Sequence, residues 1–441
     1  MLTQSGGGPV SVDLKSDRGR VQLSVLIYLL FCIAMSLYTW IWFAIHRHGH
    51  HYFPLGEREE RFGDLLRFSG KYQIGKDPRI LDNDHLIGTL FPRNYPPFAV
   101  VIYLFLLQVC APYALPAMLV PIVATAAVAC VLLWRKVRHF ESYRWYIGVA
   151  IFATGLLGWG MQQVAMRGNI EGVMWIAVCI GAYLYATRRY SGSAVAFGIA
   201  CCIKPYPVLW FAIMARHRRY REVAIGLVAS AALTLASLLV IDRNPFRAYR
   251  RISGISNFFD YYIVCIRPID EMMGDHSILQ TMKTLARVVR NHGLHFPPYE
   301  SWMHLNDPLA WKLYHDYLPL AAVIGLVVLW RVWNKPVLNQ IFALACVTVV
   351  LPPVAADYTL SLLAIPMGFF LIFLLQDAAE GKPSLSLAKL LWFLFPCAWI
   401  MATEPLMVLH GVLKTVAVLV LLAASVIVPL PSTLFGERQP A

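Results

Sequence analysis

Long apolar stretches separated by short polar turns run along most of the chain. A helix needs about 20 apolar residues to cross the hydrocarbon core of a bilayer, and many of these stretches approach that length. The pattern therefore predicts an all-α polytopic membrane protein. The predicted spans are 21–45, 115–134, 146–163, 172–187, 222–241, 317–333, 337–354, 358–376, 388–403 and 405–429.

Two further apolar stretches, 95–112 and 192–215, contain prolines and need separate treatment. Basic residues of short loops stay in the cytoplasm, and keeping the cluster at 135–144 inside requires that 95–112 does not cross. We expect 95–112 to enter the membrane from outside and return, or to lie along the interface. Stretch 192–215 has basic residues at both ends and Lys204-Pro205 in its middle, which predicts a hairpin of two short helices whose tip points outward.

These assignments predict a bundle of about twelve membrane helices with both termini in the cytoplasm. A cytoplasmic segment, 1–20, precedes a single transmembrane domain, 21–429, and a cytoplasmic tail, 430–441, follows it. Two long loops, 46–114 and 242–316, face outward, and the first of them includes the re-entrant stretch. We expect a multi-pass protein of the cell membrane.

Composition agrees with this topology. The 441 residues are 58% hydrophobic and only 14% charged, whereas soluble domains carry about 25% charged residues. The net charge of +13 comes from short basic runs between apolar stretches, which argues against nucleic-acid binding. Eight of the nine cysteines lie in or beside apolar segments and none forms a CxxC motif, so we expect small buried hydrophobes. The chain has no internal repeat, which argues against a transporter built from repeated halves.

Asp64 is the first polar residue of chemical interest on the outward side. It lies on the border of a short amphipathic stretch, 59–68, that suits a helix on the bilayer surface. Because partial burial makes a carboxylate a stronger base, Asp64 is placed to act as a general base at the level of the lipid headgroups. The alternative is an ordinary solvated aspartate.

Two more outward features carry charge. Arg167, Asn169 and Glu171 occupy one short turn between apolar segments, where such residues are costly unless water or a ligand meets them. Lys204, at the tip of the predicted hairpin, needs a counter-anion, and a lipid phosphate is a natural one. The alternative for Lys204 is snorkelling to the membrane surface.

The junction near Asp357 and the loop around His276 complete the set. Asp357 follows a double proline that ends a helix, which places it to partner Lys204 or a substrate hydroxyl. His276 precedes a basic amphipathic stretch suited to a phosphate or to anionic headgroups. The basic residues of that stretch are Lys283, Arg287 and Arg290.

The run from His46 to His51 suggests a metal site at first sight. His46 and His50 share a helical face, but Gly49 interrupts the helix and no nearby carboxylate has ligand spacing. We interpret these residues as interfacial histidines. No nucleotide-binding, zinc-protease or serine-hydrolase motif stands in a suitable context, so we expect neither a metal nor a cofactor.

The motifs occur in an order that resembles the GT-C superfamily of polyprenyl-phosphate-sugar-dependent glycosyltransferases. More narrowly, the chain resembles glycosyltransferase family 87, which includes mycobacterial polyprenyl-phosphate-mannose-dependent α-1,2-mannosyltransferases. The matching features are Phe62-Gly63-Asp64, Lys76-Asp77-Pro78, Tyr95-Pro96-Pro97, Gly168-Asn169, Lys204-Pro205, the loop around His276-Ser277, and the junction that ends in Asp357-Tyr358.

The resemblance implies a GT-C-like membrane fold that transfers a hexose, with mannose expected, from a polyprenyl-phosphate donor. The acceptor would be a lipid-linked or cell-envelope glycan on the extracytoplasmic face, and direct displacement would invert the anomeric centre. The first-loop aspartate of the family is taken as the catalytic base, which assigns this role to Asp64. The residues expected to bind the donor phosphate and sugar are Lys204, Arg167, Asn169, Asp357, Tyr358, His276 and Tyr95.

This chain departs from the family pattern at two positions. Asp357 stands where histidine commonly precedes tyrosine, and Asp275-His276-Ser277 stands where an Asn-Gln-Ser-like run is usual. These departures leave the acceptor open, and a phosphatidylinositol-mannoside acceptor is not assigned. A polytopic transporter or a lipid or oligosaccharide flippase is the alternative class, which predicts charged residues spread through the midplane of several spans. An inactive scaffold of envelope assembly is a third possibility.

Overall fold

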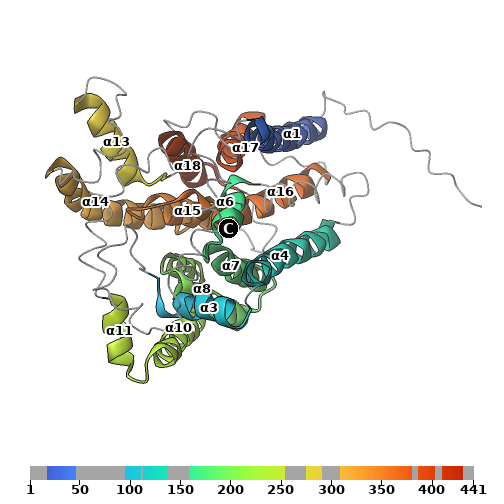
Figure 1. The fold of residues 1–441 in the computed structure, drawn as a ribbon. Coiled ribbons are helices and arrows are strands. Elements are labelled where there is room, and N and C mark those ends of the chain that lie inside the picture. Colours follow the sequence, from blue (N-terminus) through green and yellow to red (C-terminus); the bar gives the residue numbers. More distant parts are fainter. Residues whose placement is uncertain are drawn as a thin grey trace, which may run out of the picture.

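A computed structural model describes residues 17–45, 95–110, 113–137, 158–253, 275–290, 308–379, 386–402 and 410–430. All the regular elements in these ranges are helices, shown in Figure 1. They are α1 (Asp17–Ile45), α3 (Pro97–Gln108), α4 (Ala114–Val137), α6 (Trp159–Arg167), α7 (Glu171–Ala186), α8 (Tyr190–Ile203), η4 (Tyr206–Trp210), α9 (Phe211–Arg216), α10 (Tyr220–Ile241), α11 (Pro245–Ser253), α13 (Ile278–Arg290), α14 (Pro308–Val332), α15 (Val337–Val350), η8 (Asp357–Leu363), α16 (Ala364–Ala379), α17 (Leu387–Met401) and α18 (His410–Ile427).

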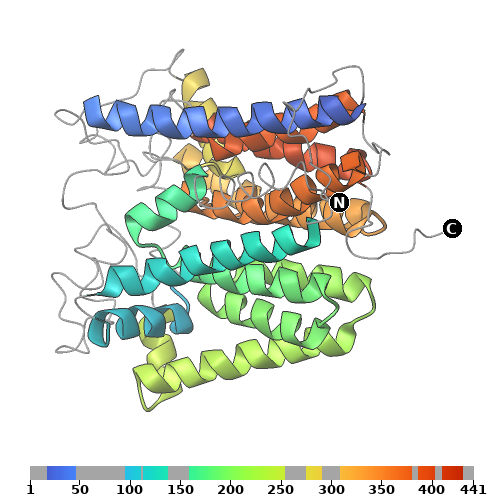
Figure 2. The ribbon, with the colours of Figure 1, turned by 90° about the vertical axis from the view of Figure 1, so that its right-hand side faces the viewer.

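The long helices lie side by side. Figure 2 shows the axes of α1, α4, α7, α8 and α10 lying nearly parallel across the molecule. The described chain has a single isolated β-bridge, between Asp275 and Ala356, and no strand. The expected all-α fold is therefore confirmed.

Within the described ranges, two helices are long and apolar enough to cross a membrane, at Tyr220–Ile241 and Trp311–Val332. Their surfaces remain largely apolar and exposed: Val228 and Val240 of α10 are each 68% exposed, and Leu326 of α14 is 67% exposed. Exposed apolar surface on such helices suits contact with lipid. Several further apolar helices have 10–17 residues, so the twelve-helix arrangement stays a prediction.

The predicted spans agree with the observed helices over most of the described chain, with two differences. Only 158–163 of the predicted span 146–163 lies within the described residues, where α6 begins at Trp159. Helix α14 begins at Pro308, so its first turns fall within the predicted outer loop 242–316. That loop also contains α11 and α13, and both are amphipathic helices.

The re-entrant or interfacial placement of stretch 95–112 stays a prediction, and its described residues contain one short helix, α3. Pro97 occupies its first position, where a missing backbone N–H costs nothing. Its 12 residues rise only about 18 Å, so α3 is too short to cross the hydrocarbon core, as expected. It packs against α10, α8 and α4.

The break that the predicted hairpin 192–215 requires is present at Lys204-Pro205, and the outward direction of its tip stays a prediction. Helix α8 ends at Ile203, and Lys204 adopts an extended backbone with φ −144° and ψ 139°. The chain then turns through Pro205 into η4 and α9. Proline cannot continue a helix from the preceding residue, so Lys204-Pro205 sets the break.

Two basic turns lie next to each other at the far end of α7 and α8 from Lys204. Arg188 and Arg218 have φ values of 62° and 56°, in the left-handed region that glycine usually occupies. The Tyr185 hydroxyl lies 2.7 Å from Nδ1 of His217, which joins the two turns. The guanidinium of Arg219 lies 4.3 Å from the ring centroid of Tyr190.

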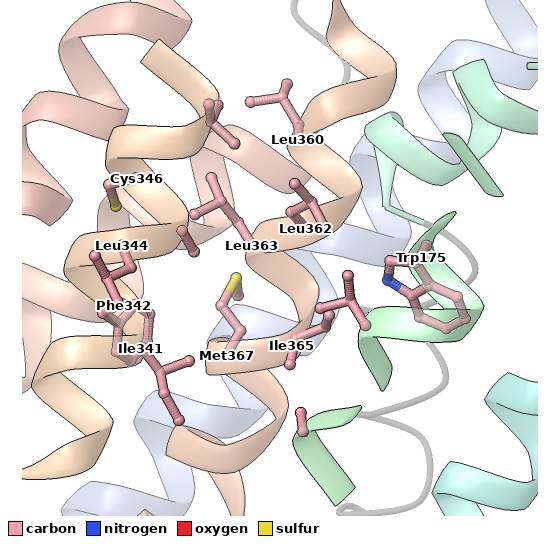
Figure 3. Packing of buried hydrophobic residues seen from close by; sticks show 14 of the residues in the cluster. Trp175, Ile341, Phe342, Leu344, Cys346, Leu360, Leu362, Leu363, Ile365 and Met367 are labelled. Carbon is pink, nitrogen blue, oxygen red and sulfur yellow. The ribbon is translucent and has the colours of Figure 1, made fainter. Parts of the chain in front are cut away.

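The core forms around α15, whose residues are all buried. Phe342 contacts the rings of Phe370 and Phe393 at centroid distances of 5.8 and 5.5 Å. Figure 3 shows the leucines of η8 between α15 and Trp175 of α7. This packing fixes η8, which begins with Asp357 and Tyr358.

The seven cysteines in the described chain are free thiols. Four of them are buried and the other three are half-buried. This agrees with their prediction as small core residues. Buried cysteines of this kind contribute packing and carry no sign of a disulfide framework.

Candidate functional site

Lys204 lies at a meeting point of residues from four segments. Its ammonium is 4.8 Å from the ring centroid of Tyr95 and 5.7 Å from that of Tyr358. Its Nζ is also 4.0 Å from a carboxylate oxygen of Glu171. Aromatic faces and a carboxylate both attract a cation. The Lys204 side chain keeps 17% of its surface exposed, whereas that of Glu171 has none.

Tyr103 supports this arrangement from α3. Its ring packs edge-on against Tyr95 with a centroid distance of 5.5 Å. Its hydroxyl accepts the backbone N–H of Ile170 at 2.9 Å and donates to the carbonyl of Gly168 at 3.4 Å. Tyr103 is fully buried, so it holds the turn between α6 and α7 in place and packs as a core residue.

The turn itself is built from Gly168 and Asn169. Gly168 ends α6 with φ 60°, a conformation that glycine adopts without steric cost. The side-chain oxygen of Asn169 accepts the backbone N–H of Glu171 at 2.8 Å. Arg167, the last residue of α6, is half-buried directly before this turn.

Glu171 is the carboxylate nearest Lys204 in the described chain. It begins α7 and is 0% exposed. Neither of its carboxylate oxygens has a hydrogen-bond donor among the described residues. A helix N-terminus favours a negative charge, but two buried acceptor oxygens without donors are unusual.

Asp357 makes other contacts than the pair with Lys204 that its position suggested. Its Oδ2 accepts the indole N–H of Trp159 at 2.5 Å, and its Oδ1 lies 3.4 Å from Nδ1 of His276. Asp357 and His276 are both buried. Tyr358, the next residue, contributes the ring that faces Lys204.

His276 belongs to a hydrogen-bond network that ties the segment before α13 to the segment between α15 and η8, to η8 itself and to α18. Its backbone N–H donates to the carbonyl of Ala355 at 2.9 Å, and its Nε2 lies 3.2 Å from the hydroxyl of Thr359. Its carbonyl accepts the hydroxyl of Thr415 at 2.8 Å. One oxygen of Asp275 accepts the backbone N–H groups of Ser277 and Ala355 at 2.9 and 3.1 Å.

The structure thus brings together six of the predicted site residues. Tyr95 and Tyr358 contact Lys204 directly, Asn169 adjoins Glu171, and Asp357 and His276 form a network beside Tyr358. Asp64, the predicted base, lies outside the described residues, as do Lys76-Asp77-Pro78 and His46 to His51.

The basic stretch after His276 forms α13. Lys283 is 3% exposed, so its ammonium does not lie on an open surface. The side chains of Arg287 and Arg290 lie outside the described part. Within the described residues, no group of three or more histidine, cysteine, aspartate or glutamate side chains is arranged to hold a metal ion.

Sequence reasoning missed three contributors to the site. Trp159 lies in an apolar run without any distinguishing signal, and Thr359 follows the junction motif. Glu171 was noted in the turn but was not assigned to Lys204. The one available signal was an acidic residue at the start of an otherwise apolar helix.

The helical fold, the lipid-suited surfaces of α10 and α14 and the polar cluster at Lys204 together fit an integral membrane enzyme. The family model of glycosyltransferase family 87 matches residues 94–353, which is more than half of the chain, so this chain belongs to glycosyltransferase family 87. Members of this family are membrane proteins, and the expected GT-C relationship is confirmed. No curated protein and no solved structure matches the chain.

Proposed function

We propose that this glycosyltransferase moves a hexose, with mannose expected, from a polyprenyl-phosphate donor to a lipid-linked or cell-envelope acceptor. The reaction would take place on the extracytoplasmic face of the cell membrane. The observation that carries the proposal is the placement of Lys204. A half-buried ammonium, held between two aromatic rings and a buried carboxylate, is a suitable partner for a lipid phosphate.

The proposed chemistry is a direct displacement. Asp64 removes the proton of the acceptor hydroxyl as its oxygen attacks the anomeric carbon. The bond between the anomeric carbon and the phosphate oxygen breaks, and polyprenyl phosphate leaves with the electron pair. Attack opposite the leaving group inverts the anomeric centre. Phosphate is a good leaving group, so no general acid is required.

Lys204, with Arg167 or a basic residue of the predicted second outer loop, stabilises the charge that develops on the departing phosphate. A fixed cation in a water-poor site stabilises such charge far more than it would in bulk water. Tyr95 and Tyr358 keep the ammonium in place from two sides. Asn169 shapes the turn that carries Arg167, and Asp357 and His276 hold Tyr358 in position.

The sidedness of the proposal is supported by the two ends of α8. The basic turns at Arg188 and Arg218 lie at one end of the α7–α8 pair and Lys204 lies at the other. Basic turns stay in the cytoplasm, which favours an outward site at Lys204. The predicted outward loop of Asp64 belongs to the same side.

The proposal is tested by incubating the purified protein with radiolabelled polyprenyl-phosphate mannose and extracted envelope lipids. We expect label to move to a new lipid, and Asp64→Asn to stop this transfer in a protein that still folds. Asp316→Asn, at an exposed position on α14, is the matched control and should retain activity. Full transfer by Asp64→Asn would refute the assigned base.

A panel of other polyprenyl-phosphate hexoses decides the sugar. If the wild-type protein moves no sugar from any of them, the glycosyl-transfer proposal with this donor class is wrong. Movement of the intact lipid-linked sugar between leaflets of a vesicle, without transfer, would instead support a flippase. Labelling of a cysteine at Gly63 in intact cells tests the sidedness, and labelling only after lysis would overturn it.

A further inference from the structure

The carboxylate of Glu171 lies at the centre of the candidate site and can accept hydrogen bonds that the described residues do not supply. Both of its oxygens are buried, and the part of the chain that the structure describes gives neither of them a donor. An ionised carboxylate can accept about four hydrogen bonds, and a buried one without donors costs free energy. A ligand that supplies the missing donors explains why a buried carboxylate is kept at this position.

Lys204 does not satisfy Glu171. The Nζ–Oε2 distance of 4.0 Å is that of an ion pair without a hydrogen bond. The ammonium also contacts the rings of Tyr95 and Tyr358. It therefore lies beside the carboxylate without donating a hydrogen bond to it.

The opposite charges of Lys204 and Glu171 attract two different kinds of ligand group. Lys204 attracts an anion, whereas Glu171 repels a phosphate and attracts hydroxyl donors. A sugar phosphate presents both kinds of group side by side, because the C2 hydroxyl stands on the carbon atom next to the anomeric carbon that carries the phosphate. The 17% exposure of the Lys204 side chain indicates that the ligand approaches from its side.

We propose that Glu171 binds hydroxyl groups of the transferred sugar while Lys204, 4.0 Å away, binds the donor phosphate. On binding, the phosphate pairs with the ammonium of Lys204. The sugar hydroxyls then donate hydrogen bonds to the carboxylate of Glu171. This inference rests on the proposed function and adds to it a residue that recognises the sugar. Glu171 is thus a specificity residue, and Lys204 is an anchor for any lipid phosphate.

A pair of ligands tests this division of roles. Binding of polyprenyl phosphate, which has no sugar, and of polyprenyl-phosphate mannose is measured to the full-length protein in nanodiscs. Glu171→Gln is expected to weaken binding of the sugar-bearing ligand by roughly 10-fold or more and to leave binding of polyprenyl phosphate unchanged or tighter. Lys204→Ala should weaken the binding of both ligands.

Glu222→Gln is the matched control. Glu222 also lies 4.0 Å from a cation, Arg219, but at the basic-turn end of α10. It should bind both ligands as the wild type does. If Glu171→Gln weakens the binding of both ligands equally, the inference is overturned, because Glu171 would then only position Lys204. No effect on either ligand would overturn it as well.

Two further measurements make the outcome decisive. If Glu171→Gln does not fold, Glu171→Asp keeps the charge and is expected to weaken only the sugar-bearing ligand. If the wild type binds the two ligands as expected but transfers no sugar, the proposed function fails and the assignment of Glu171 stands. If transfer occurs and Glu171→Gln does not discriminate between the ligands, only this inference fails.

Discussion

His276 Nδ1 lies 3.4 Å from Asp357 Oδ1, in a buried pair that joins the segment before α13 to η8. The two residues are also the two departures from the family pattern. A histidine is usual at the junction position held by Asp357, and this chain carries a histidine directly opposite. The imidazole group is thus present at the junction, but it comes from another segment of the chain.

Breaking this pair should destabilise the protein. The Asp357→Asn variant still accepts the indole N–H of Trp159 but removes the carboxylate that faces His276. The His276→Gln variant removes the imidazole that faces Asp357. We expect each substitution to cost about 1–3 kcal/mol, and the double variant to cost less than the sum. Thermal unfolding of the three purified variants measures this coupling. Additive losses would show that the two residues are energetically independent.

Lys204 is predicted to contribute through its charge. Lys204→Ala should lower the rate of sugar transfer by about 100-fold or more, and Lys204→Arg should retain part of the rate because the charge remains. Lys312→Ala, at an exposed position on α14, is the control and should behave as the wild type. A Lys204→Ala variant with wild-type transfer would exclude the phosphate role.

Tyr95 is predicted to act on Lys204 through the face of its ring. Tyr95→Phe keeps an aromatic face and should change transfer little, whereas Tyr95→Leu should weaken donor binding by a factor of about 5, since an exposed cation–π contact contributes roughly 1 kcal/mol. Titration of polyprenyl-phosphate mannose against each variant measures the effect. Equal losses in both variants would point to the hydroxyl instead.

Gly160 is predicted to be essential for the contact between α6 and η8. A Cβ at this position would lie 2.4 Å from the backbone nitrogen of Ser361, and backbone cannot move aside cheaply. Gly160→Ala should therefore destabilise the protein by about 1–3 kcal/mol. Gly368→Ala is a matched control, because nothing lies within 4 Å of its Cβ and alanine favours a helix. The midpoint of thermal unfolding should fall for the first variant only.

The left-handed turn at Arg188 predicts a stabilising substitution. Glycine adopts φ 62° without the cost of about 1 kcal/mol that a side chain incurs, so Arg188→Gly should raise the thermal midpoint slightly. Arg189→Gly, at φ −91°, lacks this benefit and should not raise it. A lower midpoint for Arg188→Gly would show that the arginine side chain contributes more than its backbone costs.

Much of the fold was predictable because membrane helices follow local rules. Apolar length placed α7, α10 and α17 within a residue or two, and Lys204-Pro205 located the break in the hairpin. The start of α14 was missed because its first turns carry Lys312 and Asp316, which lower the local hydropathy although they remain helical.

The site was predictable only in part. The motifs identified Tyr95, Lys204 and Tyr358, and their shared sidedness implied that they meet. The partner of each charge depends on packing between distant segments, which no local pattern encodes. The contact between Trp159 and Asp357 spans 198 positions, and the choice of Glu171 for Lys204 follows from the turn at Gly168.

The length of α8 has a consequence for where in the bilayer the reaction would occur. Its 14 residues rise about 21 Å, while the hydrocarbon core is about 30 Å thick. With the arginine turn at the inner water boundary, the ammonium of Lys204 would stand roughly 9 Å beneath the outer one. A polyprenyl headgroup that reaches it would have to sink out of the headgroup layer, leaving much of its water behind.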